Sequence, residues 1–247
     1  MPTRLRYLRR PRLKEPVLVA GLPGIANVGK LALEYLVHKL AAEKFLELYS
    51  DYFPEWVIQD EGLVSPLKVD FFHCRPEGLK QDMILVTADA QAATSTGQYA
   101  LTDDLLDVAA RHGVKVVGSM AAYVVSAEER RVYGVVGAAS DASLIKVLSQ
   151  SGVRLLNNGV IVGMNGMIPV MASRRGMRGF CLLGVTEGGV LDAGAAAAVL
   201  RSLATVLNFK LELKDLEQQA KKLAKLTPPA PVPEINIGAE EEPSYIR

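Results

Sequence analysis

Apolar positions along this chain fall into two patterns, short continuous runs and longer stretches in which they recur three or four residues apart. Continuous runs are typical of strands buried on both faces of a sheet, and the wider spacing is typical of amphipathic helices. We therefore expect buried strands at residues 17–20, 83–87, 114–118, 131–136, 159–163 and 180–185, and helices at residues 31–40, 98–112, 141–150, 165–174, 193–207 and 214–226. Strands that alternate with helices predict an α/β domain with a mostly parallel sheet.

The region from Phe53 to Cys74 follows a different pattern. Trp56-Val57-Ile58 and Leu63-Val64 flank Gly62, and apolar and polar residues alternate between Leu67 and Phe72. Short alternating runs around a turn residue are typical of antiparallel strands. We expect a meander of short antiparallel strands here.

Short polar residues mark several helix starts. Thr94 to Gly97 supplies one start, and Asp192 is expected to cap the alanine-rich helix that follows it. Asn165 is expected to cap the helix of residues 165–174, and Pro169 fits the first turn of that helix. A contact of the Asn165 carboxamide with a ligand is the alternative.

A glycine-rich loop from Gly21 to Lys30 joins the first buried strand to the first helix. Its Gly24-xxxx-Gly29-Lys30 spacing is close to that of a P-loop, but Leu31 stands where a P-loop has the Ser or Thr that holds Mg²⁺. We therefore do not expect nucleotide hydrolysis. Two interpretations stay open: the glycines let the helix approach the sheet, or free N–H groups at the helix start bind an anion.

Polar residues that follow predicted strands define a candidate ligand crevice, because ligands of open α/β sheets bind at the carboxyl ends of the strands. The residues are Gly24, Asn27, Asp89, Asn165 and Glu187. Asp89 is a candidate base or ribose ligand, and Glu187 is the best lone carboxylate for acid–base chemistry. The alternative for both is a surface turn, since nothing in the sequence pairs Glu187 with a partner. We expect no catalytic residues.

Composition excludes several classes of protein. The chain has 247 residues, 49% hydrophobic and 22% charged, with a net charge of +1, so a large core is expected and a strong field for nucleic acid or a membrane surface is not. Cys74 and Cys181 are expected to be buried thiols of a reducing cytoplasm. The three histidines show no zinc-site spacing, so we expect no metal and no cofactor.

The two ends of the chain differ from the body. Six basic residues lie before Glu15, which suggests a solvated edge strand or a patch for an anionic partner. After residue 226 the chain becomes proline-rich, then acidic at Glu240-Glu241-Glu242, and it closes with Tyr245-Ile246-Arg247. We expect a single α/β domain over residues 1–226 and a flexible tail over residues 227–247 that projects from it.

Four segments together resemble the proteasome assembly chaperone 2 family, in particular its archaeal homologues. The segments are residues 21–30, 96–100, 159–166 and 181–187, the last followed by Asp192 and the alanine-rich helix. The resemblance implies a three-layer α/β/α sandwich of the nucleoside-phosphorylase type and no catalysis. It also implies a homo-oligomeric scaffold that binds α subunits of the 20S proteasome. Some members end in a hydrophobic-Tyr-any-residue motif that opens the proteasome gate.

The end of this chain departs from that motif. Tyr245 is third from the end instead of second, and Ser244 precedes it where a hydrophobic residue is expected. Arg247 also adds a cation beside the terminal carboxylate. The sequence leaves two functions for the tail, direct gate opening or binding of another client. The alternative function for the whole chain is an enzyme or small-molecule-binding protein that uses the crevice.

Overall fold

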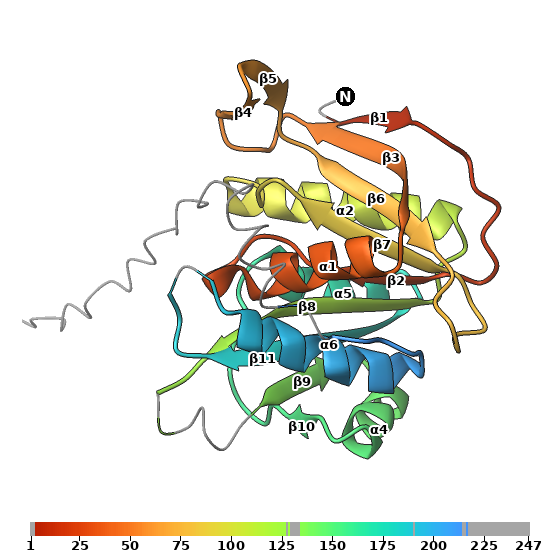
Figure 1. The fold of residues 1–247 in the computed structure, drawn as a ribbon, viewed down its shortest axis with the longest axis vertical. Helices are drawn as coiled ribbons and strands as arrows, with labels where there is room; N and C mark the ends of the chain where they lie inside the picture. Colours follow the sequence, from red (N-terminus) through yellow and green to blue (C-terminus); the bar gives the residue numbers. More distant parts are fainter. Residues whose placement is uncertain (1–2, 127, 129–133, 190, 214–215, 217–247) are drawn as a thin grey trace, which may run out of the picture.

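The computed structural model of this chain describes residues 3–126, 128, 134–189, 191–213 and 216. Within these residues, a nine-stranded sheet runs in the order β1-β3-β6-β7-β2-β8-β11-β9-β10 (Figure 1). Its strands are β1 (Thr3–Tyr7), β2 (Val17–Ala20), β3 (Glu43–Ser50), β6 (Val69–Cys74), β7 (Met83–Ala88), β8 (Val116–Val124), β9 (Val135–Ala139), β10 (Arg154–Leu155) and β11 (Arg178–Thr186).

The centre of the sheet is parallel and its flanks are mixed. Strands β7, β2, β8 and β11 pair in parallel, as do β9 and β10. Strands β1, β3, β6 and β7 pair antiparallel, and β9 is antiparallel to β11. Every residue of β7 is buried, as its continuous apolar run predicted. The parallel strands at the centre confirm the predicted α/β class.

Helices cover both faces of the sheet, which gives the three layers that the resemblance implied. Helices α1 (Val28–Lys39) and α6 (Ala193–Leu207) pack together on the face nearest the viewer in Figure 1. A short 3-10 turn η1 (Ile25–Asn27) precedes α1 in the chain. Helices α2 (Ser95–Arg111) and α5 (Met164–Ser173) pack on the opposite face. Helix α4 (Ala142–Gln150) lies beside β9 and β10. None of the described helices is both long and apolar enough to span a bilayer.

The predicted helix caps are present at two starts. The Thr94 hydroxyl accepts a 3.1 Å hydrogen bond from the N–H of Gly97, and Asp192 Oδ1 accepts a 2.9 Å bond from the N–H of Ala195. Each of these bonds satisfies a donor that the first turn of a helix leaves without an intrahelical partner.

Two strand predictions differ from the structure. Residues 159–163 form a loop, because Gly159 and Gly163 take positive φ angles of 139° and 86°, which an extended strand does not adopt. The strand expected at 131–136 is observed at Val135–Ala139, and residues 129–133 lie outside the described residues. Strands β3 and β10 were missed. The helix expected at 214–226 lies outside the described residues except for Leu216, so it stays a prediction.

The predicted short antiparallel strands are present, but they do not form a meander, because β6 pairs with β3 and β7 instead of with β5 (Leu63–Pro66). Strands β4 (Val57–Asp60) and β5 pair antiparallel in a separate two-stranded sheet, at the top of Figure 1. Glu61 and Gly62 form its two-residue loop with φ angles of 47° and 85°. Positive φ at both central positions is what the tight hairpin turn requires.

Candidate functional site

The glycine loop lies at the carboxyl end of β2, and its glycines are required for packing. A Cβ on Gly29 would lie 2.2 Å from the main-chain oxygen of Met120, and a Cβ on Gly21 would lie 2.2 Å from that of Gly29. No side chain fits at either distance. The loop therefore uses these glycines to bring α1 against β8, as the packing interpretation predicted.

Lys30, the lysine of the P-loop-like spacing, is engaged within the protein. It is buried, and its Nζ donates a 2.9 Å hydrogen bond to the main-chain oxygen of Ala88 at the end of β7. The same Nζ lies 3.0 Å from Glu34 Oε1. An ammonium group committed to a carbonyl and a carboxylate is poorly placed to hold a phosphate.

Two carboxamides join the glycine loop to the start of α5. Asn165 Oδ1 accepts a 3.0 Å bond from the N–H of Leu22, and its Nδ2 donates a 3.1 Å bond to the carbonyl of the same residue. Gln91 Nε2 donates a 2.6 Å bond to the carbonyl of Pro23, and Gln91 Oε1 accepts a 2.8 Å bond from the N–H of Met164. We call these two side chains the carboxamide clamp.

The clamp corrects one prediction and adds one residue. Asn165 does not cap α5: Gly163 is the cap position, and the Asn165 side chain reaches across to the glycine loop instead. Gln91 was missed as a functional side chain. The only signal was its position two residues after Asp89, in the loop that follows a buried strand.

The remaining crevice residues lie at the same edge of the sheet in different environments. A Cβ on Gly24 would lie 3.8 Å from Asn165 Nδ2, which places this glycine beside the clamp. Asn27 has a φ of 48° at the start of α1, and its N–H donates to the carbonyl of Gly24. Glu187 is exposed. Farther along the chain, the N–H of Asp192 donates a 3.0 Å hydrogen bond to the carbonyl of Ala26, beside Asn27.

Asp89 is turned away from the clamp, towards the chain before β6. Its Oδ2 accepts a 3.0 Å bond from the N–H of Lys68 and lies 3.7 Å from Lys68 Nζ. Burial favours the neutral form of Lys68, but Asp70 and Asp89 outweigh it and raise the pKa of that amine. Burial raises the pKa of Asp70, against the opposing pull of Lys44 at 2.7 Å. These contacts form a structural network of ion pairs among Lys44, Asp70, Lys68 and Asp89.

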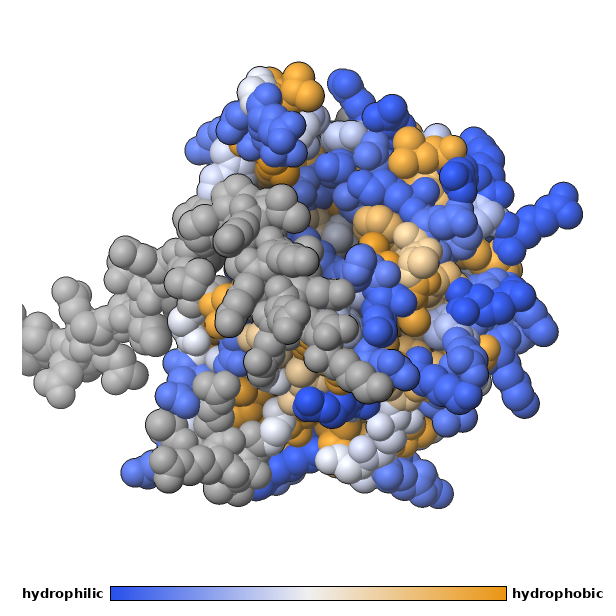
Figure 2. Space-filling model, in the orientation of Figure 1, coloured by the Kyte–Doolittle hydropathy of each residue, from blue (hydrophilic) through white to orange (hydrophobic). Residues whose placement is uncertain are grey.

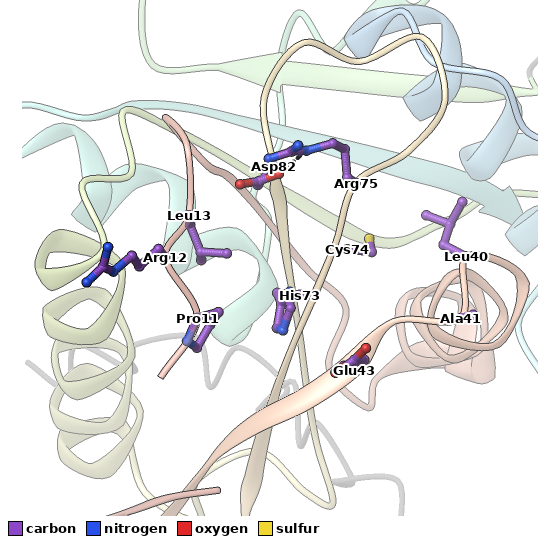
Figure 3. A pocket seen from close by; sticks show the side chains of 10 residues that line it. All are labelled: Pro11, Arg12, Leu13, Leu40, Ala41, Glu43, His73, Cys74, Arg75 and Asp82. Carbon is purple, nitrogen blue, oxygen red and sulfur yellow. Dashed lines mark hydrogen bonds and ion pairs between the residues drawn. The ribbon is translucent and has the colours of Figure 1, made fainter. Parts of the chain in front are cut away.

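A cavity lies at the opposite end of the parallel strands from the clamp. This cavity of about 520 Å³ is lined by Pro11, Arg12, Leu13, Leu40, Ala41, Glu43, His73, Cys74, Arg75 and Asp82 (Figure 3). Arg75 Nε donates a 2.6 Å bond to Asp82, and Arg12 points away from the other lining side chains. Burial raises the pKa of the Cys74 thiol to about 12, so it is not a nucleophile near neutral pH. Among the described residues, no cluster of three His, Cys, Asp or Glu could hold a metal.

Comparison with known proteins places this fold in a family. Residues 18–227 match the sequence model of the PAC2 family. The chain belongs to the PAC2 family. It is 34% identical over 213 residues to the uncharacterized protein MJ1210 of Methanocaldococcus jannaschii, covering 85% of this chain and 80% of that protein.

Solved PAC2-like structures share the whole fold. PbaB of Pyrococcus furiosus, described as an archaeal proteasome activator, superposes with a TM-score of 0.80 and 31% identity over 91% of this chain and 97% of its own. PbaA of the same organism, described as an archaeal homolog of proteasome-assembly chaperone, gives a TM-score of 0.74 and 24% identity over 92% and 95%. The second likeness shows the fold alone.

The predicted tail site lies outside the described residues of this PAC2 chain. Tyr245, Ile246 and Arg247 belong to residues 217–247, so their role as a partner-binding end stays a prediction, as does the division into a domain and a tail. A ligand in the crevice beside the clamp also stays a prediction.

Proposed function

We propose that this chain is a non-enzymatic, homo-oligomeric protein of the proteasome-assembly-chaperone type, which works in the cytoplasm and binds α subunits of the 20S proteasome or a related protein client. The observation that carries the proposal is the likeness to PbaB, an archaeal proteasome activator, at 31% identity along nearly the full length of both chains. This likeness covers 91% of this chain and 97% of PbaB.

The chemistry of the sheet edge supports a non-enzymatic role. Lys30 is committed to Ala88 and Glu34, and the carboxamides of Asn165 and Gln91 bind the main chain of the glycine loop. These are the polar groups that an α/β enzyme would aim at a substrate. Here these groups hold two segments of the fold together, and we propose that the protein acts by binding other proteins through its surface.

The C-terminal end is the proposed contact with the proteasome or client. The prolines at residues 228, 229, 231 and 233 are typical of an extended spacer, and Tyr245 and Ile246 after them offer an aromatic ring and an apolar side chain. Such a segment suits a pocket between two subunits, and several copies in one oligomer add their binding through avidity. We propose that residues 245–247 bind the partner, and the assay below tests separately whether binding opens the gate.

The experiment mixes the purified full-length protein with an archaeal 20S core and measures co-migration on a native gel together with peptide hydrolysis. We expect co-migration with the wild type and a loss of at least about tenfold in affinity when Tyr245 to Arg247 are deleted. The matched control replaces Glu240, Glu241 and Glu242 with Gln, which keeps the length and the end of the tail.

The outcomes separate the parts of the proposal. Co-migration without faster hydrolysis identifies an assembly or adaptor role, and faster hydrolysis identifies an activator. Co-migration that survives the deletion would assign binding to the domain and overturn the role of the tail. Absence of co-migration and of any change in hydrolysis would reject the proteasome as the partner.

A further inference from the structure

The β4–β5 hairpin exposes several large apolar side chains to solvent. Leu63 is 79% exposed, Val64 70% and Val57 61%, and no residue of β4 or β5 is buried. Pairing places Val57 opposite Pro66 and Val64 opposite Gln59 on one face, with Leu63 on the other. An isolated two-stranded hairpin is marginally stable in water, so a covering surface would stabilise it.

The hairpin also carries charge of one sign. Between residues 51 and 67 the chain has the acids Asp51, Glu55, Asp60 and Glu61 and no Lys or Arg. All four are exposed, and none forms an ion pair with a described residue. The hairpin is thus an apolar surface beside carboxylates that form no ion pair with the described residues, which selects a partner with apolar and cationic side chains.

The edge of the same sheet has those properties. Strand β1 and the arm that follows it, residues 3–14, carry the bases Arg4, Arg6, Arg9, Arg10, Arg12 and Lys14 and no acid. Arg6 pairs with Glu47 and Arg9 with Glu43, and Arg10 stacks over Tyr7. Arg4 and Arg12 are exposed and form no ion pair with the described residues. Leu8, 43% exposed, supplies an apolar contact among them.

We infer that the β4–β5 hairpin of one copy of this chain docks against the β1 arm of a second copy. The occupant is a second copy because the complementary charge lies on this chain itself: four acids on the hairpin and in the segment before it that form no ion pair with the described residues, and an all-basic arm, in a protein whose net charge is only +1. Figure 2 shows the hairpin at the top of the molecule as apolar atoms among hydrophilic ones. A contact between two unlike patches repeats from copy to copy and can close a ring.

This inference rests on the proposed homo-oligomer and names its interface. The test measures the mass of the full-length protein by light scattering across a dilution series. We compare the wild type with Leu63→Ser/Val64→Ser, with Asp60→Lys/Glu61→Lys, and with Arg4→Glu/Arg12→Glu. Each double variant is expected to raise the concentration at which the oligomer dissociates by about tenfold or more. All six positions are exposed, so circular dichroism should show an unchanged fold.

A charge exchange makes the test specific. The protein that combines Asp60→Lys/Glu61→Lys with Arg4→Glu/Arg12→Glu should regain most of the wild-type mass, because each reversed patch again meets its opposite sign. Lys146→Glu on α4 and Val170→Ser on α5 are matched controls at exposed positions outside the two patches, and they should leave the mass unchanged.

The outcomes distinguish this inference from the proposed function. An oligomer that persists in every hairpin and arm variant overturns the interface and leaves the homo-oligomer standing. A wild type that is monomeric throughout the dilution series overturns both the interface and the homo-oligomer. Binding to the 20S core is measured separately, so its failure bears on the proposed partner alone.

Discussion

The hydroxyl of Ser119 on β8 donates a 2.5 Å hydrogen bond to the main-chain oxygen of Asn165 in the first turn of α5. In a regular helix that oxygen would accept from the N–H of residue 169, but residue 169 is a proline and has no N–H. The strand therefore supplies the donor that the helix lacks. Gly179 permits the close packing, since a Cβ there would lie 2.1 Å from the oxygen of Pro169.

This relationship predicts coupling between Ser119 and Pro169. Ser119→Ala should lower the free energy of unfolding by about 2 kcal/mol, because it leaves the buried Asn165 oxygen with only the weak Cys181 thiol contact at 3.9 Å. Pro169→Ala restores a helical donor, so the double variant should lose about 1 kcal/mol less than the sum of the single variants. Urea unfolding of the four proteins measures the cycle. Additive losses would contradict the exchange of donors.

The carboxamide clamp predicts a large effect at Asn165. Asn165→Ala removes both hydrogen bonds to Leu22 and leaves a buried N–H and a buried carbonyl without partners, so we expect a loss of about 3 kcal/mol in unfolding free energy. Asn157→Ala, at an exposed position in the loop before α5, is the control and should change the unfolding free energy by less than about 0.5 kcal/mol. Equal losses in the two variants would show that the clamp contributes little.

The packing of the glycine loop predicts the effect of a single methyl group. Gly29→Ala would place a Cβ 2.2 Å from the Met120 oxygen, and since both atoms belong to central elements, the strain should cost about 3 kcal/mol or more. Gly134→Ala is the matched control, because a Cβ there meets nothing within 4 Å. Thermal denaturation compares the two, and an unchanged midpoint for Gly29→Ala would show that the loop can shift.

Burial of His112 predicts a pH dependence with a definite sign. Burial lowers the pKa of His112 below the ordinary 6.5, so the folded state favours the neutral ring. This ring lies edge-to-face with the ring of Phe45, and the two ring centroids are 5.2 Å apart. Its contribution to stability is complete above pH 6.5 and is lost as the pH falls from 6.5 through the lower pKa of the folded state. The difference in unfolding free energy between wild type and His112→Gln should therefore shrink on acidification. A difference that is constant or grows between pH 7 and pH 5 would contradict this.

The order of residues in the sequence predicts much of where the candidate site lies. It predicts few of the hydrogen bonds that the site residues form. Loops after strands β2, β7 and β11 were correctly expected to gather at one edge, because parallel strands end together. That expectation singled out Asp89, yet its neighbour Gln91 is the residue that contacts the glycine loop, and Asp89 contacts Lys68. The path of the loop decides which of two nearby side chains turns inward. A loop has no regular spacing of apolar residues, so the sequence pattern does not predict that path.

The sequence by itself determined the order of most strands and helices, two helix caps and the membership that the PAC2 match bears out. These depend on local periodicity, on short polar residues next to their helices, and on motif order. Only the tertiary structure decided that Asn165 bridges to Leu22, 143 residues away, and that Ser119 replaces the donor missing at Pro169. Those bonds depend on the pairing of β8 with β2 and β11, which brings distant segments within 3 Å and leaves no trace in any short stretch of the chain.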